Sequence, residues 1–201
     1  MSAVSMLITA EEYLVQERQA AFKSEFWCGE LFTMAGGSPN HSLIAVNFVG
    51  ACWQSLKGKS CKVFNSDLRV KVTASGLYTY PDASIVCGEL QFDDAQKDTV
   101  TNSTVLVEVL SDSTEKYDRG AKSGHFRQIT SLKEIILIAQ TEPLVERFTC
   151  QVNGGWLLIE SRGFSDRVRL ESVEISIPLS ELYRGVSFDA KVPGEHTGEH
   201  H

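Results

Sequence analysis

The run TVLVEVL at residues 104–110 constrains the fold of this chain more than any other segment. A near-continuous stretch of aliphatic and β-branched residues is typical of a strand that is covered on both faces. Such a strand needs helices or a second sheet on each side of it. The run therefore predicts a sheet in the interior of a layered fold.

The segments around this run alternate between helix and strand patterns. Thr9 and Glu12 form a capping-box pattern that opens a helix reaching about Ala20, and residues 22–34 read as a hairpin turning at Cys28 and Gly29. Further strands are expected at 62–64 continuing into 68–72, at 77–87, 104–110, 135–140, 144–151, 156–161 and 173–177, with helices at about 40–57, 111–128 and 179–183 and a loop at 88–103. This order predicts an α+β or mixed α/β fold.

Composition limits the classes of protein to consider. The chain has 201 residues, 42% of them hydrophobic and 22% charged, which predicts one folded domain over residues 1–190 and a disordered polar tail over 191–201. The net charge of −7 argues against a protein that coats nucleic acid by bulk charge, although a local basic groove is still compatible with it. The sequence contains no apolar run of the length of a membrane span and no secretory signal pattern, so we expect a cytoplasmic protein without a membrane partner.

The cysteines point in the same direction. There are five, an odd number, and they show neither a C-x-x-C motif nor paired zinc spacing. We therefore expect no disulfide framework, no structural zinc site and a reducing compartment.

Two acidic residues stand at unusual places. Glu108 is the only charged residue of its apolar run, and a buried carboxylate needs a cation, hydrogen bonds or a proton to offset its desolvation. Glu108 is either a site residue or a structural residue. In the second case it pairs with an Arg or lies at a strand end that water can reach. Pro81 precedes Asp82 at the entry of the strand at 77–87, and a proline there favours an edge, a strand start or a bulge that aims the next side chain out of the ladder. Period two would put Tyr80, Asp82 and Ser84 on one face.

Lys122 lies on the helix predicted after the Glu108 strand. Two interpretations are open. Lys122 forms an exposed ion pair with Asp118 four residues earlier, or it reaches back towards the end of the Glu108 strand.

Together these segments resemble a known family. The motifs are GEL at 29–31, HS at 41–42, YPD at 80–82, EVLSDST at 108–114, YDRGAK at 117–122 and HFRQ at 125–128. In order and spacing they resemble the Uma-type restriction endonuclease family, uncharacterised prokaryotic proteins of the PD-(D/E)XK nuclease superfamily. The resemblance extends over residues 7–188. It implies a restriction-endonuclease-like core, with a central mixed sheet flanked by helices.

The resemblance also implies a set of site residues. Asp82 matches the aspartate of the PD motif and Glu108 the acidic residue of the second half-motif. The lysine of the motif should stand two residues after Glu108, but Leu110 is there. Lys122 is the natural substitute.

Two accessory positions also match the family. Glu25 is either part of the pocket or an exposed strand residue. His41 is either part of the pocket or a cap of the helix that begins beside it. Cys28 occupies a turn position where Asp is expected.

These residue types predict a mechanism. The carboxylates of Asp82 and Glu108 and the backbone carbonyl of Val109 are hard oxygen ligands of the kind that Mg²⁺ or Mn²⁺ prefers. A divalent ion there would neutralise a phosphate group and lower the pKa of a bound water molecule, while Lys122 orients the nucleophile or stabilises developing charge. We therefore expect a metal-dependent endonuclease that hydrolyses nucleic acid, with DNA as the expected substrate. Arg119 and Arg127 are candidate substrate contacts. Cutting a duplex needs two strand scissions, which favours a homodimer.

Two other hypotheses stay open. A catalytically silent DNA-binding or interaction protein could share the fold, because fold does not fix function. Its candidate surface is the densest cationic cluster, which can also be read as a solvated helix end and strand face: Lys57, Lys59, Lys62, Arg69 and Lys71. The third hypothesis is metal-dependent hydrolysis of another phosphorylated substrate such as a nucleotide. The sequence has no P-loop that would indicate nucleotide-driven work.

Overall fold

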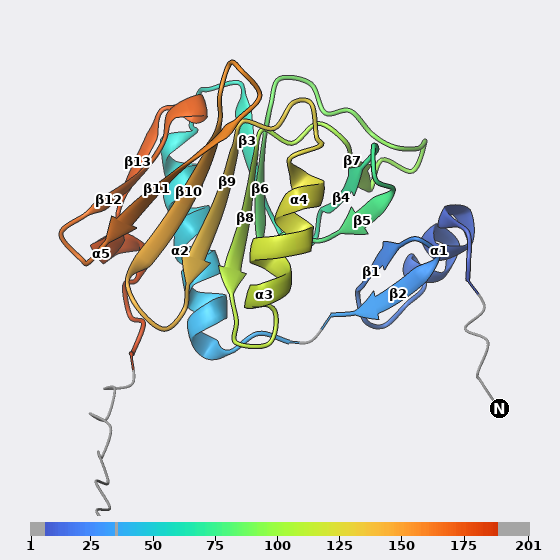
Figure 1. Ribbon diagram of the computed structural model, residues 1–201, viewed down its shortest axis with the longest axis horizontal. Helices are drawn as coiled ribbons and strands as arrows, with labels where there is room; N and C mark the ends of the chain where they lie inside the picture. Colours follow the sequence, from blue (N-terminus) through green and yellow to red (C-terminus); the bar gives the residue numbers. More distant parts are fainter. Residues whose placement is uncertain (1–6, 35, 189–201) are drawn as a thin grey trace, which may run out of the picture.

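The computed structural model describes residues 7–34 and 36–188 and arranges them as three β-sheets with flanking helices (Figure 1). The central sheet has the strand order β11-β10-β9-β8-β6-β3. Its strands are β3 (Cys61–Asn65), β6 (Ala83–Cys87), β8 (Val105–Leu110), β9 (Glu134–Ala139), β10 (Leu144–Cys150) and β11 (Trp156–Arg162). β8 and β9 run parallel and the other neighbours antiparallel, so the sheet is mixed.

A second sheet of five strands has the order β2-β1-β5-β4-β7. Its strands are β1 (Ser24–Trp27), β2 (Glu30–Thr33), β4 (Arg69–Val72), β5 (Leu77–Thr79) and β7 (Thr99–Val100). The third sheet pairs β12 (Arg167–Leu170) with β13 (Ile175–Pro178). The helices are α1 (Ala10–Glu17), α2 (Pro39–Ser55), α3 (Glu115–Tyr117), a π-helical turn (Asp118–Lys122), α4 (Ser123–Phe126), a 3₁₀ turn (Glu171–Val173) and α5 (Leu179–Leu182).

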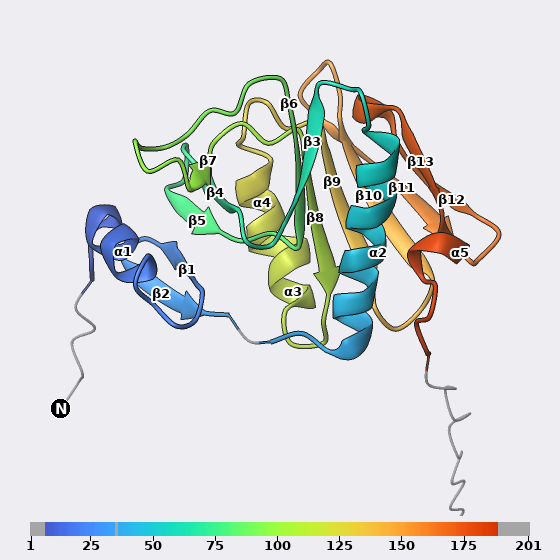
Figure 2. The same ribbon diagram turned by 180° about the vertical axis from the view of Figure 1, so that it is seen from behind.

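Strand β8 is covered on both faces, as its apolar run predicts. Val105, Val107 and Val109 pack into a core that also contains α2, α5, β12 and β13. Leu106 and Leu110 point to the other core, which is shared with β4, β7 and α4. Figures 1 and 2 show α2 on one side of the central sheet and α3 and α4 on the other. The predicted α+β architecture with a central mixed sheet is confirmed.

The N-terminal helix and hairpin are also confirmed. Thr9 and Glu12 form both bonds of a capping box at the start of α1. Tyr13 of α1 stacks on Phe26 of β1 with ring centroids 5.0 Å apart, and Tyr78 of β5 packs against both rings. At the hairpin turn Cys28 and Gly29 have φ values of 51° and 88°, in the left-handed region that such a tight turn needs. The hairpin joins the second sheet because β1 pairs with β5.

Two predicted strands are each divided between sheets. Residues 77–87 form β5 in the second sheet and β6 in the central sheet, and Tyr80, Pro81 and Asp82 lie between them. Pro81 cannot donate a ladder hydrogen bond, so the strand ends there and the chain changes sheet. The period-two face that we predicted from Tyr80 through Asp82 to Ser84 is therefore wrong. Residues 62–72 are divided in the same way between β3 and β4.

Smaller differences concern short elements. The predicted loop at 88–103 contains the two-residue strand β7, which is held by its parallel pairing with β4. Strand β12 is missing from the prediction, and Val173 belongs to a 3₁₀ turn before β13. The predicted helix at 111–128 begins at Glu115 and contains the π-helical turn. The predicted tail at 191–201 lies outside the described residues.

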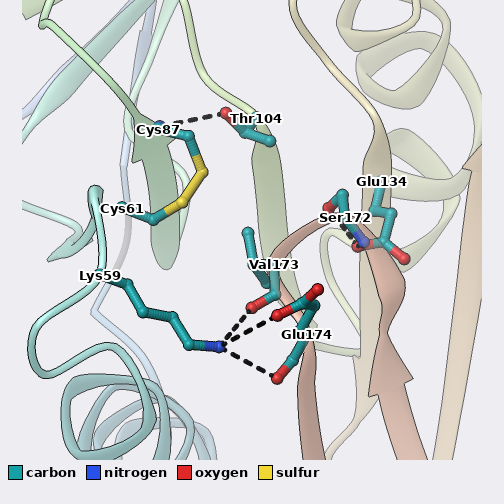
Figure 3. Close-up of a disulfide and its surroundings, with 8 residues drawn as sticks. All are labelled: Lys59, Cys61, Cys87, Thr104, Glu134, Ser172, Val173 and Glu174. Carbon is teal, nitrogen blue, oxygen red and sulfur yellow. Dashed lines mark hydrogen bonds and ion pairs between the residues drawn. A yellow bond between two sulfur atoms is a disulfide. The ribbon is translucent and has the colours of Figure 1, made fainter.

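The prediction of no disulfide is wrong. Cys61 of β3 and Cys87 of β6 are directly opposite each other in the antiparallel ladder, and their sulfur atoms are bonded (Figure 3). An odd number of cysteines says nothing about which two the sheet places opposite each other. The cysteine content therefore no longer argues for a reducing compartment.

Within residues 7–34 and 36–188 we find no helix with both the length and the hydrophobicity that a membrane crossing requires.

Candidate active site

Asp82 and Glu108 lie where β6 and β8 begin to separate. Ala83, the first residue of β6, faces Val107 of β8, so Asp82 stands one step beyond the paired region, next to Glu108. The backbone N–H of Val109 donates a hydrogen bond of 2.7 Å to Asp82 Oδ2. The backbone of β8 therefore fixes the carboxylate of Asp82, the residue that precedes β6.

Glu108 is 4% exposed, although it carries a carboxylate. The Nζ atom of Lys122 lies 2.9 Å from Glu108 Oε1 and occupies one of the two acceptor directions of this oxygen. The buried oxygen therefore keeps an unused acceptor direction. Burial raises the pKa of Glu108 well above its usual range, and the nearby carboxylates of Asp82 and Asp118 raise it further against the opposing effect of Lys122.

Lys122 is the cation at the centre of the site, and it is 4% exposed. Its Nζ atom lies 2.8 Å from Glu25 Oε1 and 3.6 Å from Asp118 Oδ1, in addition to the contact with Glu108. Burial opposes the charged form of this amine, but the three carboxylates outweigh burial and raise the pKa of Lys122 well above its usual value. Lys122 therefore reaches back to the Glu108 strand, as the second of the two sequence interpretations predicts.

Glu25 comes to the site from strand β1, far from the other acids in the sequence. It is buried, and it accepts hydrogen bonds from the hydroxyl groups of Thr79 and Tyr117 in addition to the contact with Lys122. The alternative of an exposed strand residue is therefore wrong.

His41 lies on the first turn of α2, with Nε2 3.2 Å from Asp82 Oδ2. The hydrogen bond to Asp82 raises the pKa of His41, and contact with the Val109 backbone adds to this effect against partial burial. The helix is capped by Ser38, whose Oγ accepts from the backbone N–H of His41. The His41 side chain is thus turned to Asp82 and does not act as the cap.

The sequence interpretation missed two participants. Asp118 is buried and pairs with Lys122 inside the site, whereas we considered only an exposed pair on a helix surface. The hydroxyl of Tyr117 orients Glu25. The Asp-x-x-x-Lys spacing was the available signal for Asp118, but helical spacing alone does not show which face is covered.

These side chains line one cavity of about 610 Å³. Its wall also includes the hairpin residues 32–34, the glycine-rich segment at 36–38, the loop at 111–114 and Gln140. Four carboxylates, from Glu25, Asp82, Glu108 and Asp118, face one ammonium group and one imidazole. The carboxyl groups thus outnumber the two basic groups, and burial together with this crowding raises the pKa values of Glu108 and Asp118.

A divalent cation fits this donor set. No group of three or more His, Cys, Asp or Glu side chains within the described ranges is already arranged as a complete metal centre. The predicted set needs only two carboxylates, from Asp82 and Glu108, with the backbone carbonyl of Val109. The unused acceptor direction of Glu108 Oε1 and the excess of carboxyl groups over basic groups are the features that a hard cation would satisfy.

Comparison with known proteins identifies the family. The model of the Uma2 family, whose description is "Putative restriction endonuclease", matches residues 10–180. The chain belongs to the Uma2 family. The predicted membership is therefore confirmed.

Two relatives of this chain come from Synechocystis sp. The uncharacterized protein slr1290 is 34% identical over 181 residues, which cover 90% of this chain and 94% of the relative. The uncharacterized protein sll1609 is 34% identical over 173 residues, covering 86% and 98% of the two chains.

A solved structure shares the Uma2 fold described above. The crystal structure of a DUF820 protein from Anabaena variabilis, titled a putative nuclease, superposes with a TM-score of 0.71 and 17% identity. The match covers 88% of this chain and 97% of the other. At this identity the match shows the fold, and it agrees with the predicted nuclease-like core.

Arg119 and Arg127 of the Uma2 chain do not line the cavity. Arg119 forms ion pairs with Glu115 and Glu146, and Arg127 lies over the rings of Phe148 and Trp156. The sequence placed both on the right helix, but helical position alone could not show that each is engaged elsewhere.

The cationic cluster at residues 57–71 does not form one basic surface either. Arg69 is buried and bonds to Thr99 and Tyr80. Lys71 pairs with Asp93, and Lys59 donates to the carbonyl of Val173 (Figure 3). Lys57 and Lys62 are exposed, but the other three members are engaged within the protein, so the five do not form the continuous surface that we considered.

Proposed function

We propose that this Uma2 protein is a metal-dependent endonuclease that hydrolyses phosphodiester bonds of nucleic acid, with DNA as the substrate. Family membership supplies the coarse class, a nuclease-like protein. The observation that carries the finer proposal is the surplus of carboxylates around Lys122 in one cavity, with a buried oxygen of Glu108 that keeps an unused acceptor direction. Such a cluster is costly to the fold and is typical of a catalytic site.

Each residue of the site has a separate role in the proposed reaction. Asp82, Glu108 and the Val109 carbonyl would hold Mg²⁺ or Mn²⁺, and the bound ion supplies Lewis-acid polarisation of the phosphate and a water molecule of lowered pKa. The Val109 N–H and His41 fix the orientation of Asp82. Lys122 stays protonated because Glu108, Glu25 and Asp118 surround it. Its ammonium group orients the attacking water or stabilises charge on the phosphate oxygens.

Cleavage of labelled DNA tests this function directly. Single-stranded, duplex and branched substrates are incubated with Mg²⁺ or Mn²⁺ and with the variants Asp82→Ala and Glu108→Ala. We expect each variant to cut at least about a hundredfold more slowly than the wild type, because each removes a group that acts on the reacting phosphate. The matched control is Glu160→Ala, which removes an exposed carboxylate of β11 far from the cavity. If wild type and both variants cut alike, the activity belongs to a contaminant.

Metal binding is measured separately from cleavage. Isothermal titration with Mn²⁺ should give binding to the wild type and none to Asp82→Asn, and Mn²⁺ should raise the thermal midpoint of the wild type alone. DNA binding that persists in EDTA and is unchanged in Asp82→Ala, without any cleavage, would instead favour the catalytically silent DNA-binding protein.

A further inference from the structure

Two exposed aromatic rings stand in the wall of the catalytic cavity. Phe32 of β2 is 44% exposed and Tyr117 of α3 is 38% exposed, and both line the cavity together with the carboxylates. Large exposed aromatic side chains in the wall of a cavity are typical of a contact with a ligand.

Both rings lie beside the same carboxylate. Phe32 is directly opposite Glu25 in the β1–β2 ladder, so their side chains project from the same face of the hairpin. The hydroxyl of Tyr117 donates a hydrogen bond of 3.1 Å to Glu25 Oε2. Glu25 Oε1 lies 2.8 Å from Lys122 Nζ. Glu25 therefore lies between the two rings and the proposed catalytic lysine.

The cavity has few basic side chains that could bind a phosphate backbone. Among the described residues that line it, the basic ones are His41 and Lys122, and each is directed at carboxylates. Proteins that bind continuous duplex DNA depend on rows of Lys and Arg that neutralise phosphates. Proteins that bind single strands also gain affinity from bases that stack on aromatic rings.

The size of the cavity agrees with an unpaired strand. Its volume of about 610 Å³ is in the range of sites for small molecules, which suits a single nucleotide. The base faces of a duplex are stacked on each other and cannot reach the two rings. The bases of a single strand or a flap can.

We infer that Phe32 and Tyr117 stack on unpaired nucleobases next to the phosphate that is cut. The substrate class is then a single strand, or a single-stranded flap or loop, in preference to continuous duplex. This inference rests on the proposed nuclease function for the position of the phosphate, while the stacking itself is measurable without cleavage.

The test uses single-stranded DNA that contains 2-aminopurine, whose fluorescence falls when the base stacks on an aromatic ring. Binding is followed with the full chain in EDTA and again in Ca²⁺, beside duplex DNA of the same sequence. We expect quenching with the wild type, tighter binding of the single strand than of the duplex, and at least about fivefold weaker binding in Phe32→Ala. Tyr117→Phe should keep the quenching because the ring remains, whereas Tyr117→Leu should reduce it. The matched control is Phe22→Ala, which removes a ring that is 77% exposed and does not line the cavity.

The possible failures are distinguishable. Cleavage of continuous duplex in preference to single strand, with equal binding by Phe32→Ala and wild type, overturns the stacking inference and leaves the nuclease function intact. Quenching that depends on both rings without cleavage in Mg²⁺ or Mn²⁺ supports the stacking and overturns the nuclease function. The absence of binding to any of these DNA molecules overturns both.

Discussion

At the scale of single residues, the site depends on one buried lysine. Lys122 compensates Glu108, Glu25 and Asp118 at distances of 2.9, 2.8 and 3.6 Å. Removing one partner of a buried ion pair is costly because the remaining charges keep their desolvation penalty without a counter-charge. The lysine therefore matters to the stability of the fold as well as to the proposed chemistry.

Replacing this lysine should destabilise the protein. We expect Lys122→Met to lower the free energy of unfolding at pH 7 by about 3–5 kcal/mol, because three buried carboxylates lose their cation. Urea denaturation measures the change. Lys116→Met, on the exposed side of the same helical segment, is the matched control and should change stability by no more than about 0.5 kcal/mol. Equal effects of the two variants would contradict the central role of Lys122.

Glu108 should make the stability of the protein depend on pH. Its pKa is raised in the folded state, so the folded protein keeps the proton to a higher pH than the unfolded chain. Folding stability therefore falls as the pH rises from about 4.3, the unfolded pKa of Glu, to the folded pKa. Glu108→Gln removes this penalty, and we expect it to gain about 1 kcal/mol at pH 7 while nuclease activity is lost.

Below the pKa of Glu108 in the unfolded chain, this residue is protonated in both the folded and the unfolded protein. The stability gained by Glu108→Gln should therefore vanish at pH 4. Urea denaturation of wild type and Glu108→Gln at pH 4 and pH 7 measures this difference. A Glu108→Gln variant that is less stable than the wild type by the same amount at both values would show that Glu108 acts through its contacts and not through its buried charge.

At the scale of elements, the π-helical turn positions the lysine. The N–H of Ser123 donates to the carbonyl of Asp118, five residues earlier, and the Ser123 hydroxyl donates to the same oxygen. A π turn contains one residue more than the α-helix can hold, and such turns are frequent at functional sites. With it, Asp118 and Lys122 both point into the cavity while Phe126 is buried in the core.

Deleting the extra residue should therefore separate folding from function. We expect a variant without Gly120 to form a plain α-helical turn, to keep cooperative unfolding, and to lose about a hundredfold of nuclease activity because Lys122 is displaced. Thermal unfolding and the cleavage assay measure the two effects. Gly120→Ala keeps the chain length, and a Cβ there meets no neighbour within 4 Å, so it serves as the control. If both variants retain full activity, the π turn does not position the lysine.

At the scale of the whole molecule, the chain crosses five times between its two larger sheets, and a disulfide links the edge strand of the central sheet to its neighbour. Cys61 on the edge strand β3 is bonded to Cys87 on β6, with a sequence separation of 26. The loop between the two cysteines contains β4 and β5 of the other sheet. The disulfide thus closes a loop that spans both sheets.

Removing this cross-link should lower stability without touching the cavity. By the loop-entropy relation, we expect Cys61→Ser with Cys87→Ser to lower the free energy of unfolding by about 3.5 kcal/mol. Urea denaturation with and without a reducing agent measures it. The wild type should respond to the reductant and the double variant should not. A wild type that is unaffected by complete reduction would show that the bond adds nothing to stability.

The local sequence determined which segments form helices and which form strands, for most of the chain. It also singled out the two acidic residues Asp82 and Glu108. Capping at Thr9, the turn at Cys28 and Gly29, and the apolar runs of β8 and β9 are short-range signals, because they act over a few residues of one segment. Asp82 and Glu108 stood out for the same reason, since each is a charge in an apolar strand context.

Only the tertiary structure decided how these segments meet. The pairing of β1 with β5 brought Glu25 to Lys122, the change of sheet at Pro81 aimed Asp82 at Val109, and the β3–β6 register placed two cysteines opposite each other. These contacts join residues far apart along the chain. No local periodicity encodes them, because they depend on which strand becomes the neighbour of which and therefore on the packing of the whole core.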